Sequence, residues 1–259
     1  MKVVPDVYED GAKQTVTESG KIAGRIPRAI NAALAGIDIW IMNREYKVAE
    51  VKKILEQKLE NVNPDNIVPP EPYIAVPAWQ AISYSMDNDE LREMYANLLA
   101  KAMNIETKNN VHPAYVEIIK QMSPLDAKNL SVICESDGLP IASFCYEYAD
   151  GSKSGNTPLI FLDNQDEEDY LFQATSISSL SRLGLINIDF EHMVFNKDEY
   201  KKFEKSEVYT EMKNINADEA YNVYNFPKDK FHNSNINMNK GVIDLTPMGD
   251  SFVDVCIKL

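Results

Sequence analysis

Four carboxylates lie within seven positions, at Asp87, Asp89, Glu90 and Glu93. Paired carboxylates can transfer protons as general acid and base, or they can bind Mg²⁺ through their oxygens. The same spacing suits the start of a helix, because Asp87 can cap the chain and Glu90 follows three positions later, as in a capping box. No histidine or nucleophile lies nearby in the sequence, so capping is the favoured interpretation. A metal-dependent enzyme that uses these carboxylates stays open as an alternative.

An acidic run between 163 and 169 is the second group that could bind a cation. It lacks the glycine and the spaced carboxylates of an EF-hand loop. Acidic side chains are favourable at the N-terminus of a helix, and a helical pattern follows this run. The run therefore indicates the start of a helix rather than a calcium site.

Cysteine and histidine are too few and too scattered for a zinc site or a disulfide framework. The three cysteines form no CxxC pair, and no histidine lies at ligand spacing from any of them. His112 precedes Pro113, where a side chain can cap a helix. The sequence contains no Walker A loop and no GxGxxG, HExxH or GxSxG motif. We therefore expect no metal, no cofactor and no intrinsic catalysis, and three buried structural thiols at Cys134, Cys145 and Cys256.

The composition is that of a soluble globular protein, with 44% hydrophobic and 25% charged residues in a chain of 259. No stretch reaches the roughly 20 apolar residues that cross a bilayer, and the first residues lack the basic-then-apolar pattern of a secretory signal. We therefore expect a cytoplasmic protein. The net charge is −14, and residues 131–259 carry most of it, with 11 basic against 22 acidic side chains.

The first part of the chain, 1–120, has the patterns of an α-helical region for assembly or sensing. Residues 1–20 are polar and contain proline and glycine, so we expect a loose arm. Residues 22–42 are small and apolar and include Trp40. They predict a helix buried within the fold or in a homodimer, with peripheral contact to a membrane as the alternative. Regular apolar spacing predicts further helices over 43–62, 75–86 and 87–103, and after His112.

The second part, 121–259, mixes helices with strands. One helix is expected from Ser123 to Glu135 and another over 167–183, closed by Gly184. Alternation predicts a hairpin of 139–148 with 157–162, and strands over 186–190 and 242–246. Between these strands the sequence predicts one charged helix over 197–225 and then an Asn-rich loop. The expected fold class is α+β, mainly α: a helical N-terminal part followed by a winged-helix-like domain with a small antiparallel sheet.

The order of elements in the second part is typical of a winged helix, in which helix 167–183 would read DNA and the strands 186–190 and 242–246 would form the wing. A helix that reads DNA should be basic, because neutralisation of phosphates dominates affinity. This helix has Arg182 alone against Glu167, Glu168 and Asp169. A winged helix used for protein contact is therefore favoured, and a DNA-binding regulator is the alternative.

Four segments of the chain resemble the abortive-infection alpha (Abi-alpha) family of bacterial proteins. They are NDELREMYANLLAKAMN at 88–104, VHPAYVEIIKQMSPLDAKNL at 111–130, SISSLSRLGLI at 176–186 and GVIDLTPMGDSFVDVCI at 241–257, and the likeness covers residues 40–259. The excursion from Tyr200 to Tyr224 and the first forty residues match poorly. The resemblance implies a bacterial defence role, in which phage propagation is stopped at the expense of the infected cell. It brings no catalytic residue with it.

These observations favour a protein that acts through contact with another protein, a phage component included, or with copies of itself. Nucleic acid is disfavoured as a partner because of the charge. The candidate interaction residues are Trp40, Glu93, His112 and Arg182. No residue is assigned to catalysis, to a cofactor or to a metal.

Overall fold

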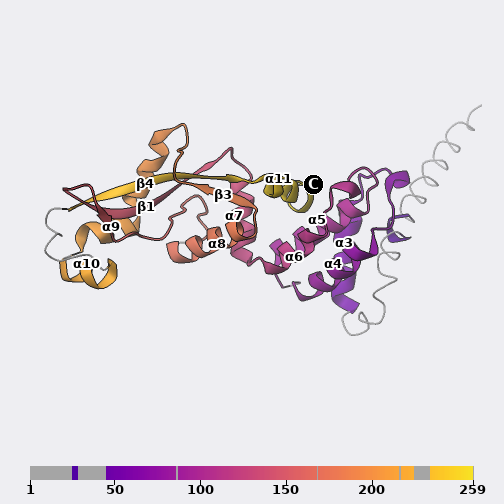
Figure 1. Ribbon diagram of the computed structural model, residues 1–259. Coiled ribbons are helices and arrows are strands. Elements are labelled where there is room, and N and C mark those ends of the chain that lie inside the picture. Colours follow the sequence, from indigo (N-terminus) through magenta and orange to yellow (C-terminus); the bar gives the residue numbers. More distant parts are fainter. Residues whose placement is uncertain are drawn as a thin grey trace, which may run out of the picture. The chain divides into compact units, whose positions relative to one another are not determined.

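The computed structural model describes residues 25–28, 45–85, 87–167, 169–215, 217–224 and 234–258 (Figure 1). Helices dominate and the strands form one small antiparallel sheet, so the expected α+β, mainly α class is confirmed. Within these ranges no helix is both long and apolar enough to cross a membrane. The arm 1–20 lies outside the described residues, as does most of the apolar segment 22–42, including Trp40.

The chain folds into two compact units. Unit 1 contains Met1–Gln121 together with Ser251–Leu259, and unit 2 contains Met122–Asp250. The sequence predicts a division at 120/121, with all later residues in the second part. In the structure the last nine residues group instead with unit 1, and the division falls within helix α11 (Pro247–Cys256).

Unit 1 is helical, and α5 (Asp89–Ala102) contacts each of its other main helices. The last part of α11 completes the core. Phe252 meets Tyr115 edge to face, with ring centroids 5.4 Å apart. Asn97 of α5 donates from Nδ2 to the backbone carbonyl of Cys256 at 2.9 Å. The remaining elements are α3 (Glu45–Lys58), η1 (Pro64–Asn66), α4 (Pro72–Tyr84), η2 (Lys108–Asn110) and α6 (Ala114–Gln121).

The cap of α5 is Asn88 rather than the expected Asp87. The side-chain oxygen of Asn88 accepts from the backbone N–H of Leu91 at 2.9 Å. Asp89 and Glu90 lie in the first turn, where negative charge is favourable. The predicted cap is therefore wrong by one position, because the side-chain amide of Asn88 satisfies the free backbone donor at the helix start. Leu91, three positions after Asn88, has no side-chain acceptor to complete a capping box.

Unit 2 contains the sheet, whose strand order is β2-β1-β4-β3. The strands are β1 (Leu139–Tyr148), β2 (Lys153–Ser154), β3 (Ile186–Asp189) and β4 (Ser234–Leu245), and all neighbours are antiparallel. β1 and β4 pair over the full length of β1, from Leu139 opposite Ile243 to Tyr148 opposite Ser234. β3 pairs only with the last residues of β4, from Val242 to Leu245.

Two strand predictions differ from the structure. The first half of β4 is the Asn-rich segment that the sequence predicts as a loop; Ile236 and Met238 pack against a buried cluster, and the asparagines occupy the alternate positions. Residues 157–162 form a single bridge, of Ala142 with Ile160, and β2 is the hairpin partner of β1 instead. Pro158 has no backbone N–H to contribute to a longer ladder.

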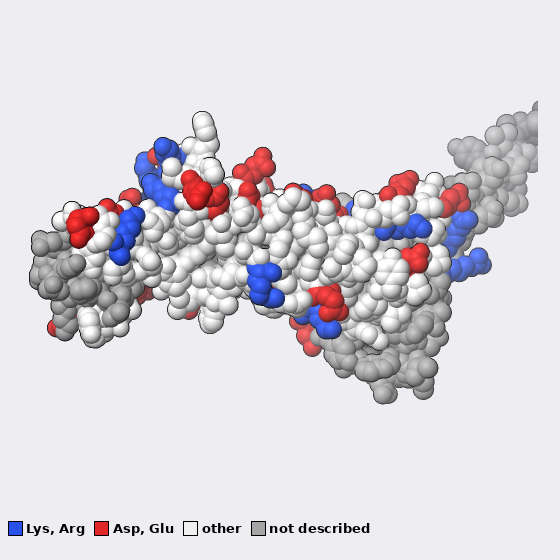
Figure 2. Space-filling view, viewed as in Figure 1, with Lys and Arg blue, Asp and Glu red and all other residues white. Residues whose placement is uncertain are grey.

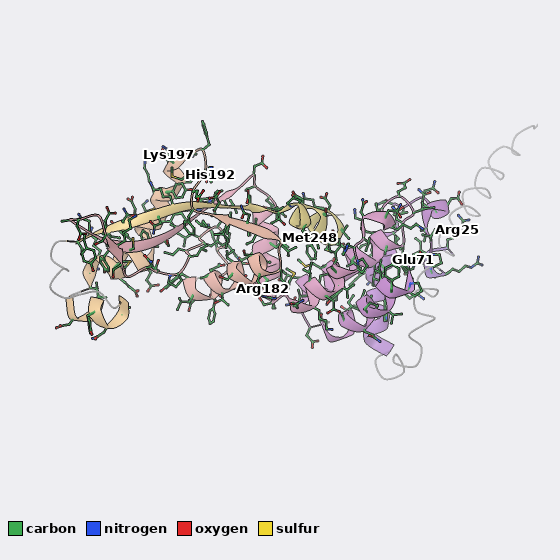
Figure 3. The ribbon with its side chains drawn as sticks, in the orientation of Figure 1. Arg25, Glu71, Arg182, His192, Lys197 and Met248 are labelled. Atoms are coloured by element: carbon green, nitrogen blue, oxygen red, sulfur yellow. The ribbon has the colours of Figure 1, made fainter. Side chains whose placement is uncertain are left out.

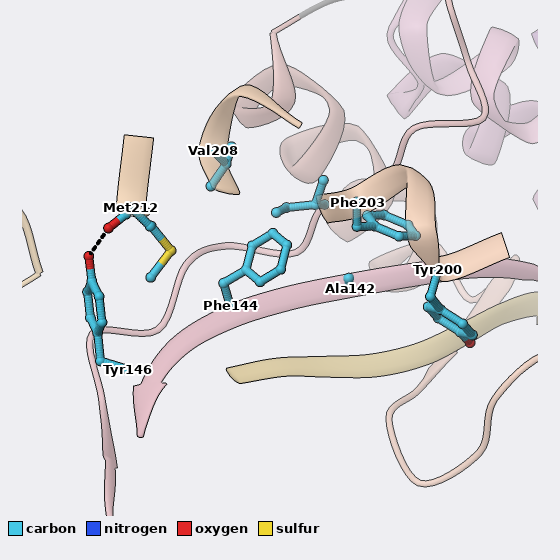
Figure 4. Close-up of a cluster of buried hydrophobic side chains, with 8 residues drawn as sticks. Ala142, Phe144, Tyr146, Tyr200, Phe203, Val208 and Met212 are labelled. Carbon is cyan, nitrogen blue, oxygen red and sulfur yellow. Dashed lines mark hydrogen bonds between the residues drawn. The ribbon is translucent and has the colours of Figure 1, made fainter. Parts of the chain in front are cut away.

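One face of the sheet packs against the segment between β3 and β4 (Figure 4). This segment forms η3 (Lys197–Lys205), α9 (Glu207–Asn214) and α10 (Ala217–Tyr224) rather than one helix. Ser206 interrupts it, because its hydroxyl caps α9 by accepting from the N–H of Tyr209. The phenol of Tyr146 donates to the carbonyl of Met212 at 2.8 Å. The buried cluster consists of Ala142, Phe144, Tyr146, Ile160, Tyr200, Phe203, Val208 and Met212.

A buried polar network joins α7 (Pro124–Ile133) to α8 (Tyr170–Arg182). Asn129, which is fully buried, donates from Nδ2 to Oε1 of Gln173 and to Oγ of Ser176, both at 2.9 Å. Its Oδ1 accepts from Nδ2 of Asn164 at 2.6 Å. Both polar atoms of the Asn129 side chain are therefore engaged, as a buried amide requires.

The turn after α8 and the start of α11 are built against each other. α8 ends in a Schellman motif, with Gly184 at φ +75° and Leu185 donating back to the carbonyl of Leu180 at 3.1 Å. Thr246 donates its N–H to the carbonyl of Leu185 at 3.0 Å, and its hydroxyl accepts from the N–H of Gly249 at 2.9 Å. Gly249 approaches Leu185 so closely that a Cβ would lie 1.9 Å from the carbonyl oxygen. Glycine is therefore needed where α11 starts.

The helices and strands expected for a winged helix are present. α7, α8 and the β3–β4 pair occupy the predicted parts of the chain. β1 lies between α7 and α8 in the sequence and pairs with β4 in the sheet. The assignment of these elements as a winged helix stays a prediction.

Candidate interaction surface

The segment between β3 and η3 exposes three large apolar side chains. Phe190, Met193 and Phe195 are 42%, 47% and 104% exposed. Single exposed apolar residues are common on protein surfaces, whereas a group of them marks a site of interaction. We call residues 190–195 the apolar loop. In Figure 3 the label of His192 marks this loop, on the opposite side of the sheet from Arg182.

Hydrogen bonds hold the backbone of the apolar loop. Before it, the carboxylate of Asp189 accepts from the backbone N–H of Glu191 at 2.6 Å and of His192 at 3.2 Å. Within it, Val194 donates to the hydroxyl of Tyr200 at 3.1 Å, and this hydroxyl donates to the carbonyl of Gly241 at 2.7 Å. Tyr200 is buried. The exposed side chains therefore project from an ordered backbone, which reduces the entropy lost when they bind.

The imidazole of His192 forms an ion pair at the start of this loop. Its Nδ1 lies 2.6 Å from Oδ2 of Asp189. The hydrogen bond to Asp189 raises the pKa of His192, and the same bond to His192 lowers the pKa of Asp189. The pair is therefore charged between the lowered pKa of Asp189 and the raised pKa of His192. The attraction between the two charges is lost as the pH rises through the raised pKa of His192 or falls through the lowered pKa of Asp189.

We expect the Asp189→Asn variant to return the pKa of His192 towards the ordinary value of about 6.5. The carboxylate that stabilises the imidazolium is then absent. An NMR titration of the histidine ring protons measures the shift, and the exposed His112 of the same molecule serves as an internal control. Equal His192 pKa values in the two proteins would contradict the ion pair.

A groove of about 560 Å³ lies beside the apolar loop. Phe190 and Met193 line one part of it, and Lys153 and Asn156 line another. Its polar lining is hydrogen-bonded: Nδ2 of Asn237 donates to the carboxylate of Glu147 at 2.5 Å. The ammonium of Lys153 donates to the side-chain oxygens of Asn237 and Asn239, both at 3.4 Å. This groove offers amide and ammonium groups next to an apolar rim.

Cys145 lies beside this groove but is a poor nucleophile. The residue is buried, and Nδ2 of Asn239 lies 3.8 Å from its Sγ. Burial raises the pKa of the thiol, and the nearby Lys153 offsets only part of that rise. A reactive cysteine needs a lowered pKa and access to solvent. Cys145 is therefore not poised for covalent chemistry at the groove.

Arg182 is exposed at the end of α8. The other exposed residues of this helix are Leu171, Phe172, Thr175 and Ser178, so its outer face is apolar and hydroxylic. On the face shown in Figure 2, the basic groups of unit 2 are interspersed with acidic and uncharged ones and form no continuous stripe among the described residues. The electrostatic footprint of a DNA reader is a basic stripe, which this view does not show.

Two of the four carboxylates between 87 and 93, Asp89 and Glu93, lie in ion pairs. Glu93 pairs with Lys58, with Oε2 and Nζ 2.6 Å apart. Asp89 pairs with Arg92, with Oδ1 and NH2 2.8 Å apart. Across the described ranges, no three acidic, histidine or cysteine side chains gather in a geometry that could hold a metal. These contacts give Glu93 a role in packing α5 against α3.

His112 lies at the start of α6, where the sequence predicts a capping residue. Its Nδ1 accepts from the backbone N–H of Ala114 at 3.1 Å. The ring also lies 5.8 Å from that of Tyr115, measured between centroids. Of the four candidate interaction residues, His112 and Glu93 belong to unit 1 and Arg182 belongs to unit 2, while Trp40 lies outside the described residues.

The apolar loop is the surface that sequence reasoning missed. The segment FEHMVF follows a strand and has the hydrophobicity of a core segment. The signal that could have identified it is the acidic residue Glu191 and the histidine His192 between its apolar residues. Asp189 before the segment and Asn196 after it are also residue types typical of turns.

A protein-family model for the family described as abortive infection alpha matches residues 43–256. This range includes every described part of the chain from α4 to the end of α11. No curated protein and no solved structure matches the chain.

Proposed function

Because this chain belongs to the abortive infection alpha family, we propose that it acts in the defence of a bacterial cell against phage through protein–protein contact. In this proposal the chain has no catalytic step of its own. The apolar loop at 190–195 and the groove beside it form the contact surface. The partner is a protein, either of the host or of the phage.

The observation that carries this proposal is the exposure of Phe190, Met193 and Phe195 on a hydrogen-bonded backbone. Burial of an aromatic or methionine side chain is worth about 1.5–3 kcal/mol, so a few such residues can dominate an interface. The polar lining of the groove supplies hydrogen-bonding groups next to this apolar anchor, as in the rim of known interfaces.

Charge supports a protein rather than DNA as the partner. Unit 2 carries the helix and strands of the predicted winged helix, and residues 131–259 hold twice as many acidic as basic side chains. DNA binding depends on neutralising phosphates, which acidic surfaces disfavour. A DNA-binding regulator that uses Arg182 is therefore the weaker hypothesis, and an electrophoretic shift lost on Arg182→Glu would revive it.

We expect the double variant Met193→Ser/Phe195→Ser to lose at least tenfold in protection when cells that express it are challenged with phage. The substitutions remove apolar area from the proposed contact, and both side chains are exposed. Plaque counts and culture collapse measure protection, and the thermal unfolding temperature of the purified protein shows whether the fold is kept.

The matched control is Ile105→Ser, which removes an apolar side chain that is 47% exposed in unit 1. This control is expected to protect as the unchanged protein does. If the double variant also protects fully, the apolar loop is not the contact surface. If the unchanged protein gives no protection against any phage tested, the defence role itself is wrong.

A further inference from the structure

β4 has two edges, and only one of them is paired along its whole length. β1 occupies one edge from Ser234 to Ile243. On the other edge β3 pairs with Val242–Leu245 and ends there. From Asn235 to Gly241, no strand in the described part of the chain pairs with this second edge. We call this stretch the open edge of β4.

The backbone groups at the open edge can be assigned from the ladder. Phe144 exchanges hydrogen bonds with Thr157, on the side of β1 away from β4. Backbone direction alternates along an antiparallel strand, so the odd-numbered residues of β1 face β4. The register pairs these with odd-numbered residues of β4. The N–H and C=O groups of the even-numbered residues Ile236, Met238 and Lys240 therefore point to the open edge.

The open edge has few of the features by which proteins usually prevent strands from pairing between molecules. Short strands, inserted charges and prolines are the common devices. β2, at the far edge of the sheet, is only two residues long and includes Lys153. The open edge contains no proline, and its one charged residue, Lys240, lies next to its end, although unit 2 as a whole is acidic.

We propose that the open edge of β4 pairs with the same edge of a second copy of the chain. The two strands run antiparallel and are centred on Asn237, so that the two sheets become one. This register places even-numbered residues opposite one another: Ile236 faces Met238 of the second copy. These are the residues whose backbone groups point outwards, so each pair can exchange two hydrogen bonds.

The side chains favour a second copy over an unrelated segment, because this register is self-complementary. Residues directly opposite each other lie on the same face of a sheet and interact. Asn237 meets its own counterpart and Asn235 meets Asn239, so amide faces amide. Ile236 meets Met238, so apolar faces apolar. Lys240, the one charged residue of the stretch, lies opposite Ser234 and not opposite another cation.

This inference goes beyond the proposed function. It concerns the purified protein without a partner, so its test does not depend on a role in defence. Sedimentation equilibrium of the full chain at about 50 µM is expected to give the mass of a dimer. The variant Met238→Pro removes an N–H that points outwards and is expected to weaken self-association at least tenfold. Met238→Leu keeps this N–H and is the matched control, expected to dimerise as the unchanged protein does.

A second pair of variants identifies the register. In Asn237→Lys and in Asn237→Asp, like charges lie opposite each other at the centre of the interface, so each variant alone is expected to associate more weakly than the unchanged protein. An equimolar mixture of the two places opposite charges together and is expected to associate more tightly than either alone.

A monomer at 50 µM would overturn the proposal and leave an extended segment of another protein as the alternative occupant of the open edge. A dimer that persists in a folded Met238→Pro variant would place the interface elsewhere. If Met238→Pro does not fold, the mixture decides: association no tighter than that of either charged variant contradicts the register and the proposal with it.

Discussion

Gly249→Ala is expected to lower the free energy of unfolding by at least about 3 kcal/mol, the upper end of what overpacking costs. A Cβ at this position would lie 1.9 Å from the carbonyl oxygen of Leu185 and 2.9 Å from its carbonyl carbon. Both are backbone atoms, so no change of rotamer relieves the contact. The start of α11 must move away from the turn after α8.

That movement breaks identifiable hydrogen bonds. Thr246 donates to the carbonyl of Leu185, and the N–H of Gly249 donates to the hydroxyl of Thr246. Urea denaturation measures the loss of stability, and the hydrogen exchange rate of the Thr246 amide reports the local change. We expect this amide to exchange faster in Gly249→Ala than in the unchanged protein.

The control for Gly249→Ala is Gly151→Ala. Gly151 has φ +80° in the turn between β1 and β2, and no atom lies within 4 Å of the position of its Cβ. Alanine there carries only the strain of a left-handed conformation, about 1–2 kcal/mol. The hydrogen exchange rate of the Thr246 amide should stay unchanged in Gly151→Ala. A loss for Gly249→Ala no larger than that for Gly151→Ala would contradict the close approach of α11 to Leu185.

Asn129→Ala is expected to lower the free energy of unfolding by about 3 kcal/mol. The substitution removes one side chain and leaves polar groups of Gln173, Ser176 and Asn164 without their partner. Each buried polar group left unsatisfied costs about 1–3 kcal/mol, reduced where water or another group can reach it. All three partners are at least nine-tenths buried, so relief by solvent is limited.

Thermal and urea unfolding measure the effect of Asn129→Ala. Ser131→Ala, two positions further along α7, is the matched control: its hydroxyl bonds only to the carbonyl of Ala127 within the same helix. We expect it to change stability by less than about 0.5 kcal/mol. Similar losses in the two variants would mean that the network contributes little to joining α7 and α8.

The helices of unit 1 could be predicted because their signals are local. Leu91, Tyr95, Leu98 and Ala102 recur at helical spacing along α5, and all four are buried. The start of α7 is equally local: Ser123 and Asp126 form the capping box that their spacing allows. Such features depend on residues a few positions apart, and a single sequence contains all of the information.

The first half of β4 could not be predicted because its strand depends on distant residues. Asn235, Asn237 and Asn239 favour turns by their local preferences. In the structure Asn237 donates to Glu147, ninety positions away. Ile236 and Met238 contact a cluster that includes Tyr200 and Phe203. Only the pairing with β1 makes the segment extended, and that pairing overrides local propensity.

The candidate surface could not be predicted either, because its exposure also depends on residues outside the loop. Apolar residues such as Phe190, Met193 and Phe195 are usually buried, and the polar residues among them are only a weak local sign of a loop. Their exposure follows from Asp189 and Tyr200, which fix the loop backbone from either side. The family resemblance, by contrast, was available from the sequence, and the family model confirms it over residues 43–256.

The grouping of Ser251–Leu259 with Met1–Gln121 has a consequence for synthesis on the ribosome. Unit 2 is continuous, so all of its residues are available once Asp250 has been added. Unit 1 must wait for the residues that pair with α5 and α6, among them Phe252 and Cys256. At about 5–20 residues per second, the residues between the two parts of unit 1 take roughly ten seconds to translate. During this interval unit 1 lacks Phe252 and Cys256, so part of its apolar interior is exposed.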